Sequence, residues 1–333
     1  MTVNDHYPLT KALAELTTEP IEALALNPAV FVWPDFSQEE IHQTIREQLG
    51  SAIPLSIGTM FNRISYAERE NLTLINTLLL HGVQQFYDSL HESTQRAGIT
   101  AQIFTLKGNG MLITEAMARL LPIGTLGAVF ANKLLAAAKL TPSGNMLFLA
   151  KSGDSLYIGL GENFLPKIPS SPTKDKQTEI TLPHPVTKKI RLPQGQQESY
   201  FVQALKQALS DLNQPEEFLP VVLTGCNGIL SMQIAHILQS LQMPFELLPL
   251  NADGAIFAPI SFEQERYFVA KNQKERIIKS KQLWEELRNI AANSGFVPDE
   301  SWTSYWEEKS IRYLPQSASL VRLGCYGPSI RQT

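Results

Sequence analysis

The chain has 333 residues, enough for two domains of ordinary size or one large domain. Hydrophobic residues make up 44% of it and charged residues 18%, which supports a buried core and excludes a disordered chain. The formal net charge is −4, so there is no general surplus of basic residues to neutralise phosphates. We therefore expect no nucleic-acid partner.

The two cysteines, Cys226 and Cys325, lie far apart and show no metal-type spacing. This excludes a disulfide framework and favours a reducing, cytoplasmic environment. The beginning of the chain lacks a basic segment followed by an apolar one, so we expect no signal peptide. Apolar runs such as Leu78–Leu80 and Leu134–Ala138 are far shorter than a membrane span. The sequence predicts no metal site and no membrane contact.

The first elements are marked by their caps. Residues 37–40 and 65–68 carry the capping-box pattern Ser-x-x-Glu, which predicts a helix to about Leu49 and a long helix ended by Gly98. A buried strand is predicted before them, at Pro28–Trp33. The long helix has apolar residues at three- and four-residue steps, which we expect to face the core. They are Leu72, Ile75, Leu79, Val83, Phe86 and Leu90.

Strands and helices alternate in the next segment. A strand at Ala101–Leu106 leads into a glycine turn, and Thr114 begins a helix that breaks near residue 122. An alanine-rich helix follows at Ala128–Leu140. The strand-like runs Met146–Ala150 and Leu156–Leu160 are separated by a few turn residues, so they predict a hairpin.

Composition changes between Pro166 and Glu198, where six prolines interrupt a polar stretch. We interpret this segment as a connection between lobes or a projecting β-arm. The predicted domains are therefore a first lobe at residues 1–165, the connection at 166–198, and a second lobe at 199–333 with a C-terminal helix.

The second lobe has a clear α/β pattern. After a helix at Ser199–Leu212, the strand Leu219–Leu223 leads through a glycine loop into a helix at Ile229–Leu241 and a strand at Phe245–Leu248. This is the βαβ order of a parallel sheet, so the predicted fold class is α/β. The sequence further predicts mostly helix over Phe262–Asn293, with a solvated charged face, and a short strand near residues 319–323.

Three glycine turns are candidates for ligand binding. The loop after Leu223 places backbone N–H groups and a helix N-terminus at the end of a buried strand, where anions bind. The same residues are equally compatible with a tight βα turn that binds nothing. The turn at 108–110 is also compatible with a plain strand-to-helix turn, and the turn at 152–154 with a simple hairpin. The candidate residues are Gly108, Asn109, Gly110, Ser152, Gly153, Asp154, Gly225, Cys226, Asn227 and Gly228.

No catalytic residue can be assigned from the sequence. A thiol at Cys226 would be activated by the helix N-terminus, but a nucleophile also needs a base, and no histidine is near it in sequence. We interpret His236 as a core or surface residue. Asp253 follows a strand and faces a cleft or caps the next helix, and the cap is the favoured interpretation.

The segments FTLKGNGMLITEAMARLLPIGT, FLAKSGDSLYIGL and VVLTGCNG, in this order, resemble the hydantoinase A/oxoprolinase family. That family belongs to the actin-like ATPase superfamily. The resemblance implies a two-lobed actin-like ATPase (ribonuclease H-like) fold, and a hydrolase or carboxylase that uses ATP and Mg²⁺. It also implies that the three glycine turns line a nucleotide-binding cleft between the lobes.

The sequence departs from the family at its phosphate hairpins. No Asp-x-Gly-Gly-Thr motif occurs, and the central hairpin has Ala150 or Lys151 in place of the leading carboxylate that would hold Mg²⁺. We therefore expect a truncated, degenerate relative that binds a nucleotide or small anion. Two interpretations of its activity stay open: an enzyme whose chemistry is supplied elsewhere or by a partner chain, and a relative that has lost catalysis. The alternative is a non-catalytic scaffold or subunit of a partner enzyme. The expected partners are a small-molecule ligand and either another subunit or a second copy of the chain.

Overall fold

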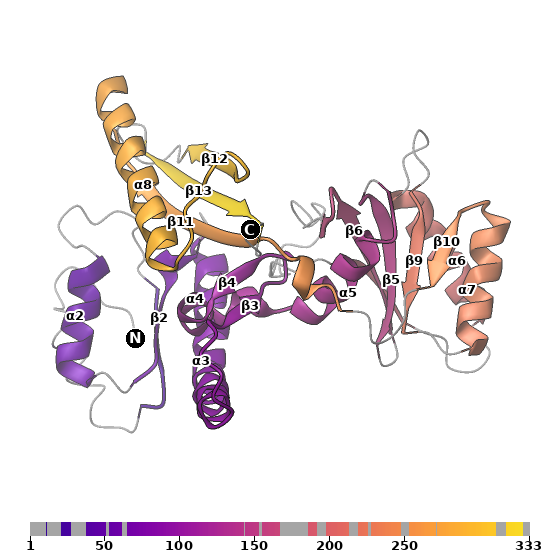
Figure 1. Cartoon of the computed structure of the whole chain (residues 1–333), viewed down its shortest axis with the longest axis horizontal. Coiled ribbons are helices and arrows are strands. Elements are labelled where there is room, and N and C mark those ends of the chain that lie inside the picture. The colour runs from indigo at the N-terminus through magenta and orange to yellow at the C-terminus, as the bar shows by residue number, and fades with distance from the viewer. Residues whose placement is uncertain are drawn as a thin grey trace. The chain divides into compact units, whose positions relative to one another are not determined.

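The structure is a computed structural model of the whole chain, and it shows an α/β protein (Figure 1). It divides into two compact units, each of which is described by itself. The first comprises Met1–Ile103, Thr114–Ile123 and Phe262–Cys325, and the second comprises Phe104–Ile113, Gly124–Ser261 and Tyr326–Thr333. The described residues are 11, 21–27, 38–50, 53–61, 65–142, 144–152, 155–166, 186–191, 198–212, 219–225, 228–247, 253–270, 272–310 and 318–328.

This division differs from the predicted one. The chain passes between units near residues 103, 113, 123, 261 and 325, and not at 166–198. The proline-rich segment contains the strand β8 (Val186–Arg191), which pairs antiparallel with β6 (Ser155–Glu162) inside the second unit. The described part of this segment therefore contributes a strand to the sheet of the second unit.

The first unit begins with a small parallel pair, β1 (Leu24–Leu26) and β2 (Leu55–Ile57), followed by the short 3-10 turn η1 (Gly58–Met60). The helix α2 (Gln38–Leu49) connects the two strands and buries Ile45 against them, which confirms the helix predicted from the first capping box. The strand predicted at Pro28–Trp33 lies outside the described residues.

The long helix α3 (Tyr66–Arg96) has the predicted ends. Ser65 accepts a hydrogen bond from the backbone N–H of Glu68, and Gly98 follows the helix with φ of +68°. The prediction of its buried face was wrong, because only Leu72 of the expected stripe is buried and Phe86 is exposed. The buried residues are Arg69, Leu72, Thr73, Asn76, Thr77, Leu80 and Tyr87.

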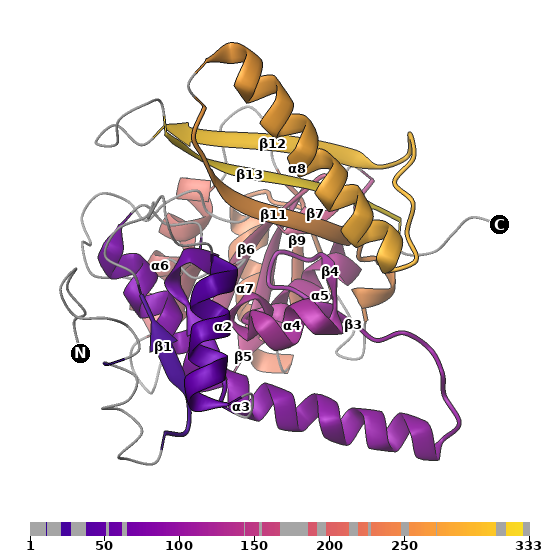
Figure 2. The same ribbon diagram turned by 90° about the vertical axis from the view of Figure 1, so that its left-hand side faces the viewer.

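The last part of the first unit is a sheet covered by one helix. The structure corrects the prediction that Phe262–Asn293 is mostly helical, since β11 (Ile260–Phe268) precedes α8 (Gln273–Asn293). Arg322 on the neighbouring strand binds Glu263 and Glu265 of β11, and these ion pairs stabilise an acidic strand. β13 (Ser319–Gly327) lies between β11 and β12 (Thr303–Ser310), and Figure 2 shows α8 running obliquely across these strands.

The second unit is built on a six-stranded sheet of its described residues. Its strands are β5 (Met146–Ser152), β6, β7 (Leu165–Pro166), β8, β9 (Val221–Thr224) and β10 (Phe245–Leu247). The order is β10-β9-β5-β6-β7, with β8 also on β6. β9 is parallel to both β5 and β10, whereas β6 is antiparallel to β5 and β8, so the predicted hairpin and βαβ unit are both confirmed.

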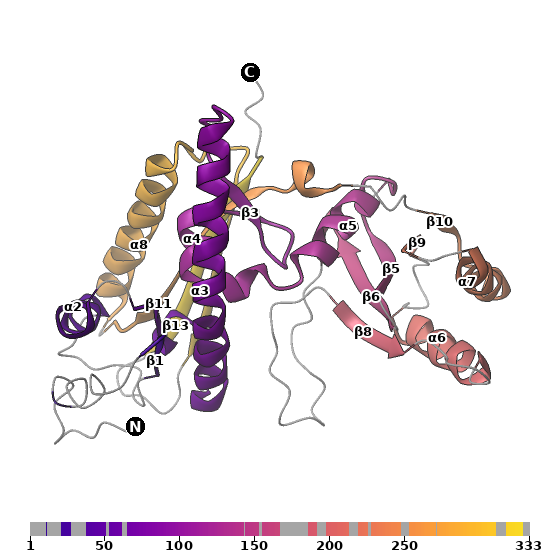
Figure 3. The same ribbon diagram turned by 90° about the horizontal axis from the view of Figure 1, so that it is seen from below.

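Helices cover both faces of this sheet. α6 (Glu198–Leu212) and α7 (Gly228–Ser240) pack on one face, and α5 (Ala128–Ala138) packs on the other. The strands alternate accordingly, since Leu147 and Leu149 point to α6 and α7 while Phe148 points to α5. Figure 3 shows β8 beside β6, with α6 and α7 at the same side of the sheet. The carboxyl ends of β5 and β9 are thereby held in a rigid layer.

Candidate functional site

The β5–β6 hairpin positions one of the predicted turns. Its pairing runs from Met146 opposite Gly161 to Ser152 opposite Ser155, which leaves a two-residue connection. Ser152 is exposed at the end of β5. The connecting residues Gly153 and Asp154 lie outside the described residues.

Gly225 lies directly beside the end of this hairpin. Ala150 of β5 is paired with Thr224 of β9, so the next residues of the two strands, Lys151 and Gly225, are neighbours. Gly225 has φ of +75°, and a Cβ there would lie 2.6 Å from the carbonyl oxygen of Lys151. Both the backbone conformation and the close approach require glycine at this position.

Two of the predicted turns therefore meet at one edge of the sheet. The chain leaves β9 at Gly225 and begins α7 at Gly228, which places the helix N-terminus directly after the strand's carboxyl end. Backbone N–H groups at such an N-terminus attract phosphates and carboxylates. Lys151 and Ser152 belong to the neighbouring strand end. Cys226 and Asn227 lie outside the described residues.

The third turn lies elsewhere, and this corrects the predicted site. Gly108, Asn109 and Gly110 form the turn between β3 (Phe104–Leu106) and β4 (Leu112–Thr114), not the start of a helix. Gly110 donates to the carbonyl oxygen of Lys107 at 3.0 Å, and the Met111 N–H donates to Asn109 Oδ1 at 3.1 Å.

Gly110 contacts Pro166, since a Cβ on Gly110 would lie 2.4 Å from the proline Cδ. Pro166 is paired with Gly161, at the opposite end of the β5–β6 hairpin from Ser152. Six residue steps of a strand separate the two ends, about 20 Å. The turn at 108–110 therefore does not line the same site as Ser152 and Gly225.

The small-residue run near residue 254 contains a 3-10 turn, η3 (Ala255–Phe257). This turn packs against α5. Asn132 Oδ1 of α5 accepts hydrogen bonds from the N–H groups of Gly254 and Ala255 at 2.8 and 2.6 Å. Asp253 Oδ1 accepts from the Ala255 N–H at 3.1 Å, but the residue at the N-cap position of η3 is Gly254, so the predicted helix cap at Asp253 is not what forms. Sequence reasoning did not predict Asn132, because it is more than 120 residues away from its partners.

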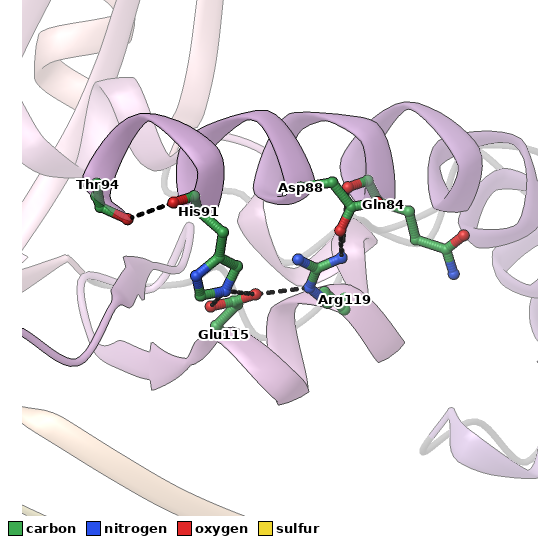
Figure 4. A network of polar contacts seen from close by, with 6 residues as sticks. All are labelled: Gln84, Asp88, His91, Thr94, Glu115 and Arg119. Carbon is green, nitrogen blue, oxygen red and sulfur yellow. Dashed lines mark hydrogen bonds and ion pairs between the residues drawn. The ribbon is translucent and has the colours of Figure 1, made fainter. Parts of the chain in front are cut away.

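A polar network in the first unit was also not predicted (Figure 4). Glu115 of α4 (Glu115–Leu120) binds the His91 ring at 2.8 Å and Arg119 at 2.6 Å, and Arg119 also binds Asp88 of α3 at 2.8 Å. Burial alone would raise the pKa of Glu115, but hydrogen bonds from Arg119 and His91 lower it below its ordinary value. The network joins α4 to α3.

Glu115→Gln is expected to destabilise the first unit by about 1 kcal/mol at pH 7. Because the pKa of Glu115 is lowered in the folded state, this contribution is complete above about pH 5 and is lost as the pH falls through the lowered value. Urea unfolding between pH 7 and pH 3 measures the difference from wild type, which should shrink with acidity. The exposed Glu92→Gln variant is the control, and a pH-independent difference for Glu115→Gln would contradict the assignment.

The other candidate groups are the Cys325 thiol, clusters of metal-ligating side chains and the charged helix α8, and none of them forms a reactive site among the described residues. Burial raises the pKa of the Cys325 thiol to about 11, so this cysteine is unreactive at neutral pH. No three His, Cys, Asp or Glu side chains in the described ranges are grouped so that they could hold a metal ion. On α8, Lys279 pairs with Glu275 one turn away at 2.8 Å, as expected for a solvated charged helix.

Within the described ranges, none of the helices combines the length and hydropathy that a bilayer-spanning helix requires.

Comparison with known proteins gives a similarity of fold. No family model and no curated protein matches the sequence. Among solved structures, the chain is similar to acetone carboxylase in its nucleotide-free state, with a TM-score of 0.54 and 11% sequence identity. The similarity covers 96% of this chain and 66% of the acetone carboxylase chain, so this protein spans less than two thirds of that chain's length. The α/β fold class predicted from the sequence agrees with this similarity.

Proposed function

We propose that this protein is a diverged member of the hydantoinase/oxoprolinase group of actin-like ATPases, and that it binds the phosphates of a nucleotide, or a small anion, at the carboxyl ends of β5 and β9. The fold similarity to acetone carboxylase, an enzyme of ATP-dependent carboxylation, supports this grouping. The strand order β8-β6-β5-β9-β10, with three antiparallel strands followed by two parallel ones, supports a ribonuclease H-like assignment for the second unit.

The close approach of Gly225 to Lys151 is the observation that carries the binding proposal. It brings the β9–α7 turn against the end of the hairpin and leaves no side chain between them. Open α/β sheets bind ligands at the carboxyl ends of adjacent parallel strands, next to a helix N-terminus. The ammonium group of Lys151 adds a positive charge to the same strand end.

The residues at this edge do not fit a magnesium ion. β5 ends in Ala150, Lys151 and Ser152, so this strand supplies no carboxylate to hold the metal. Phosphoryl transfer depends on metal ions that neutralise the developing charge. We therefore propose phosphate or anion binding without hydrolysis of ATP, and we derive no step through magnesium.

The proposal predicts that millimolar ADP, ATP or inorganic phosphate raises the thermal midpoint of the full chain, with or without Mg²⁺. A ligand at 100 times its dissociation constant stabilises the folded state by about 2.7 kcal/mol. Lys151→Glu replaces the positive charge by a negative one and should abolish the shift. Lys206→Glu, the same change at an exposed position on α6, is the matched control and should retain it.

Two results would contradict the proposal. A shift that survives in Lys151→Glu would move the site away from β5, and the absence of any shift with all three ligands would exclude anion binding. In the second case the alternative, a non-catalytic scaffold or subunit of a partner enzyme, is favoured. The missing carboxylate at the end of β5 is the observation that supports this alternative.

A further inference from the structure

The outer face of α3 is apolar and uncovered. Leu78 is 81% exposed, Phe86 is 61% exposed and Leu74 is 50% exposed, on the side of the helix opposite its buried residues. Figure 2 shows α3 as one uninterrupted helix. Between residues 71 and 89, an uncharged strip comprises Asn71, Leu74, Ile75, Leu78, Leu79, Gly82, Gln85, Phe86 and Ser89. The exposed residues His81 and Asp88 lie on one flank of this strip, where Asp88 pairs with Arg119 of α4. A solvated helix normally carries charges on this face.

Gly82 lies in the middle of this face, and the described residues leave open space around it. It is exposed, and a Cβ added to it would meet no atom within 4 Å. Glycine within a helix costs about 1 kcal/mol relative to alanine, so its presence needs a reason. Where two helices cross, small residues allow the backbones to approach closely.

The face repeats with the spacing of a helix pair. Positions 71, 75, 78, 82, 85 and 89 alternate steps of four and three residues, which is the heptad spacing of a left-handed helix–helix seam. The pattern is also balanced about Gly82, with Leu78 four residues before it and Phe86 four residues after it. In an antiparallel pair of α3 helices that crosses at Gly82, Leu78 of each copy faces Phe86 of the other.

The charges at the two ends of the helix are complementary in the same arrangement. Glu68 lies fourteen residues before Gly82 and Arg96 lies fourteen residues after it. Arg96 pairs with Glu92 of its own helix at 3.1 Å, and antiparallel pairing also places it opposite Glu68 of the other copy. A parallel pair would instead place each charge beside its own kind.

We propose that the outer face of α3 pairs with the same face of a second copy of this chain, in an antiparallel crossing centred on Gly82. The strip between residues 71 and 93 is about 33 Å long and about 10 Å wide. It thus covers about 300 Å² per copy, compared with about 800 Å² in a standard interface. An interface of this size is typical of weak, transient association, so we expect the dimer to form at micromolar or higher concentrations of the chain.

Sedimentation velocity of the full chain over this concentration range tests the proposal. Wild type should change from monomer to dimer, and Leu78→Glu should weaken the dimer at least about tenfold. Gly82→Leu should weaken it equally, while it leaves or raises the thermal midpoint, because leucine is the better helix former. This variant separates loss of pairing from loss of folding. Val297→Glu, at an apolar position that is 72% exposed and not on α3, is the matched control and should dimerise normally.

Charge reversal tests the antiparallel register. Arg96→Glu should weaken the dimer, and the additional change Glu68→Arg should restore it. A monomer at every concentration would overturn the proposal, as would dimerisation that survives in both Leu78→Glu and Gly82→Leu. Failure of the double charge reversal to restore pairing would overturn the antiparallel crossing.

Discussion

Asn76→Leu is expected to destabilise the first unit by about 4 kcal/mol, the largest effect among these substitutions. The buried Asn76 amide of α3 donates to Ser56 Oγ of β2 and to the carbonyl oxygen of Leu120, both at 3.1 Å, and its oxygen accepts from the Ile123 N–H at 3.2 Å. Leucine has a similar size but leaves three polar groups without this partner. Two of them, the Ser56 hydroxyl and the Ile123 N–H, belong to buried residues, where an unpaired group costs about 1–3 kcal/mol.

Urea unfolding of the purified chain measures this effect. Asn289→Leu is the matched control, because Asn289 is an exposed residue of α8 in the same unit and its loss should change stability by less than about 0.5 kcal/mol. A loss below about 1 kcal/mol for Asn76→Leu would show that the three partners find other hydrogen bonds.

Gly254→Ala is expected to destabilise the second unit by about 3 kcal/mol. A Cβ on Gly254 would lie 2.3 Å from both the Ala136 nitrogen and the Asn132 carbonyl oxygen. These are backbone atoms of α5, so they cannot rotate away as a side chain would. The turn must move away from the helix, which also lengthens its hydrogen bonds to Asn132.

Thermal unfolding compares this variant with Gly124→Ala in the same unit. A Cβ added at Gly124 would lie 3.9 Å from Lys107 Cε, which is an ordinary contact. We expect Gly124→Ala to be nearly neutral. Equal midpoints for the two variants would show that η3 packs less closely on α5 than the structure indicates.

The elements that depend on local signals were predictable. Ser65 and Glu68 determine the start of α3, and the βαβ unit around Gly225 follows from its strand, glycine turn and helix composition. β11 was not predicted as a strand, because Glu263 and Glu265 interrupt its apolar pattern and are stabilised by Arg322, about 60 residues away. Such a compensating charge cannot be seen in the local sequence.

The buried face of α3 was mispredicted for a related reason. Thr73 and Thr77 are polar by composition, but their hydroxyl groups donate to the carbonyl oxygens one turn earlier, at 2.6 and 2.7 Å. They can therefore be buried without leaving an unpaired donor. The leucines on the other side of the helix are more apolar than these threonines. A prediction from apolar periodicity therefore assigns the buried face to the leucines, although they are not buried.

The candidate site was only partly accessible to sequence reasoning. The glycine turns were recognisable, but which of them share a strand end depends on pairing between distant segments. Ser152 lies near Gly225 because β5 is paired with β9, whereas Gly110 lies beside Pro166 because of a contact 56 residues along the chain. Neither the proximity of Ser152 to Gly225 nor that of Gly110 to Pro166 can be predicted from the spacing of these residues in the sequence.

The order of the segments also determines the order in which the units can form during synthesis. The first unit requires both Met1–Ile103 and Phe262–Cys325, so its early helices leave the ribosome before the strands on which its sheet depends. At 5–20 residues per second, the intervening segment of about 160 residues takes roughly 8–30 s to synthesise. The second unit's sheet strands, all between β5 and β10, are complete by then. During that interval α3 already has β1, β2 and α4 beside it, whereas β12, β13, α8 and most of β11 in the same unit have not yet been made.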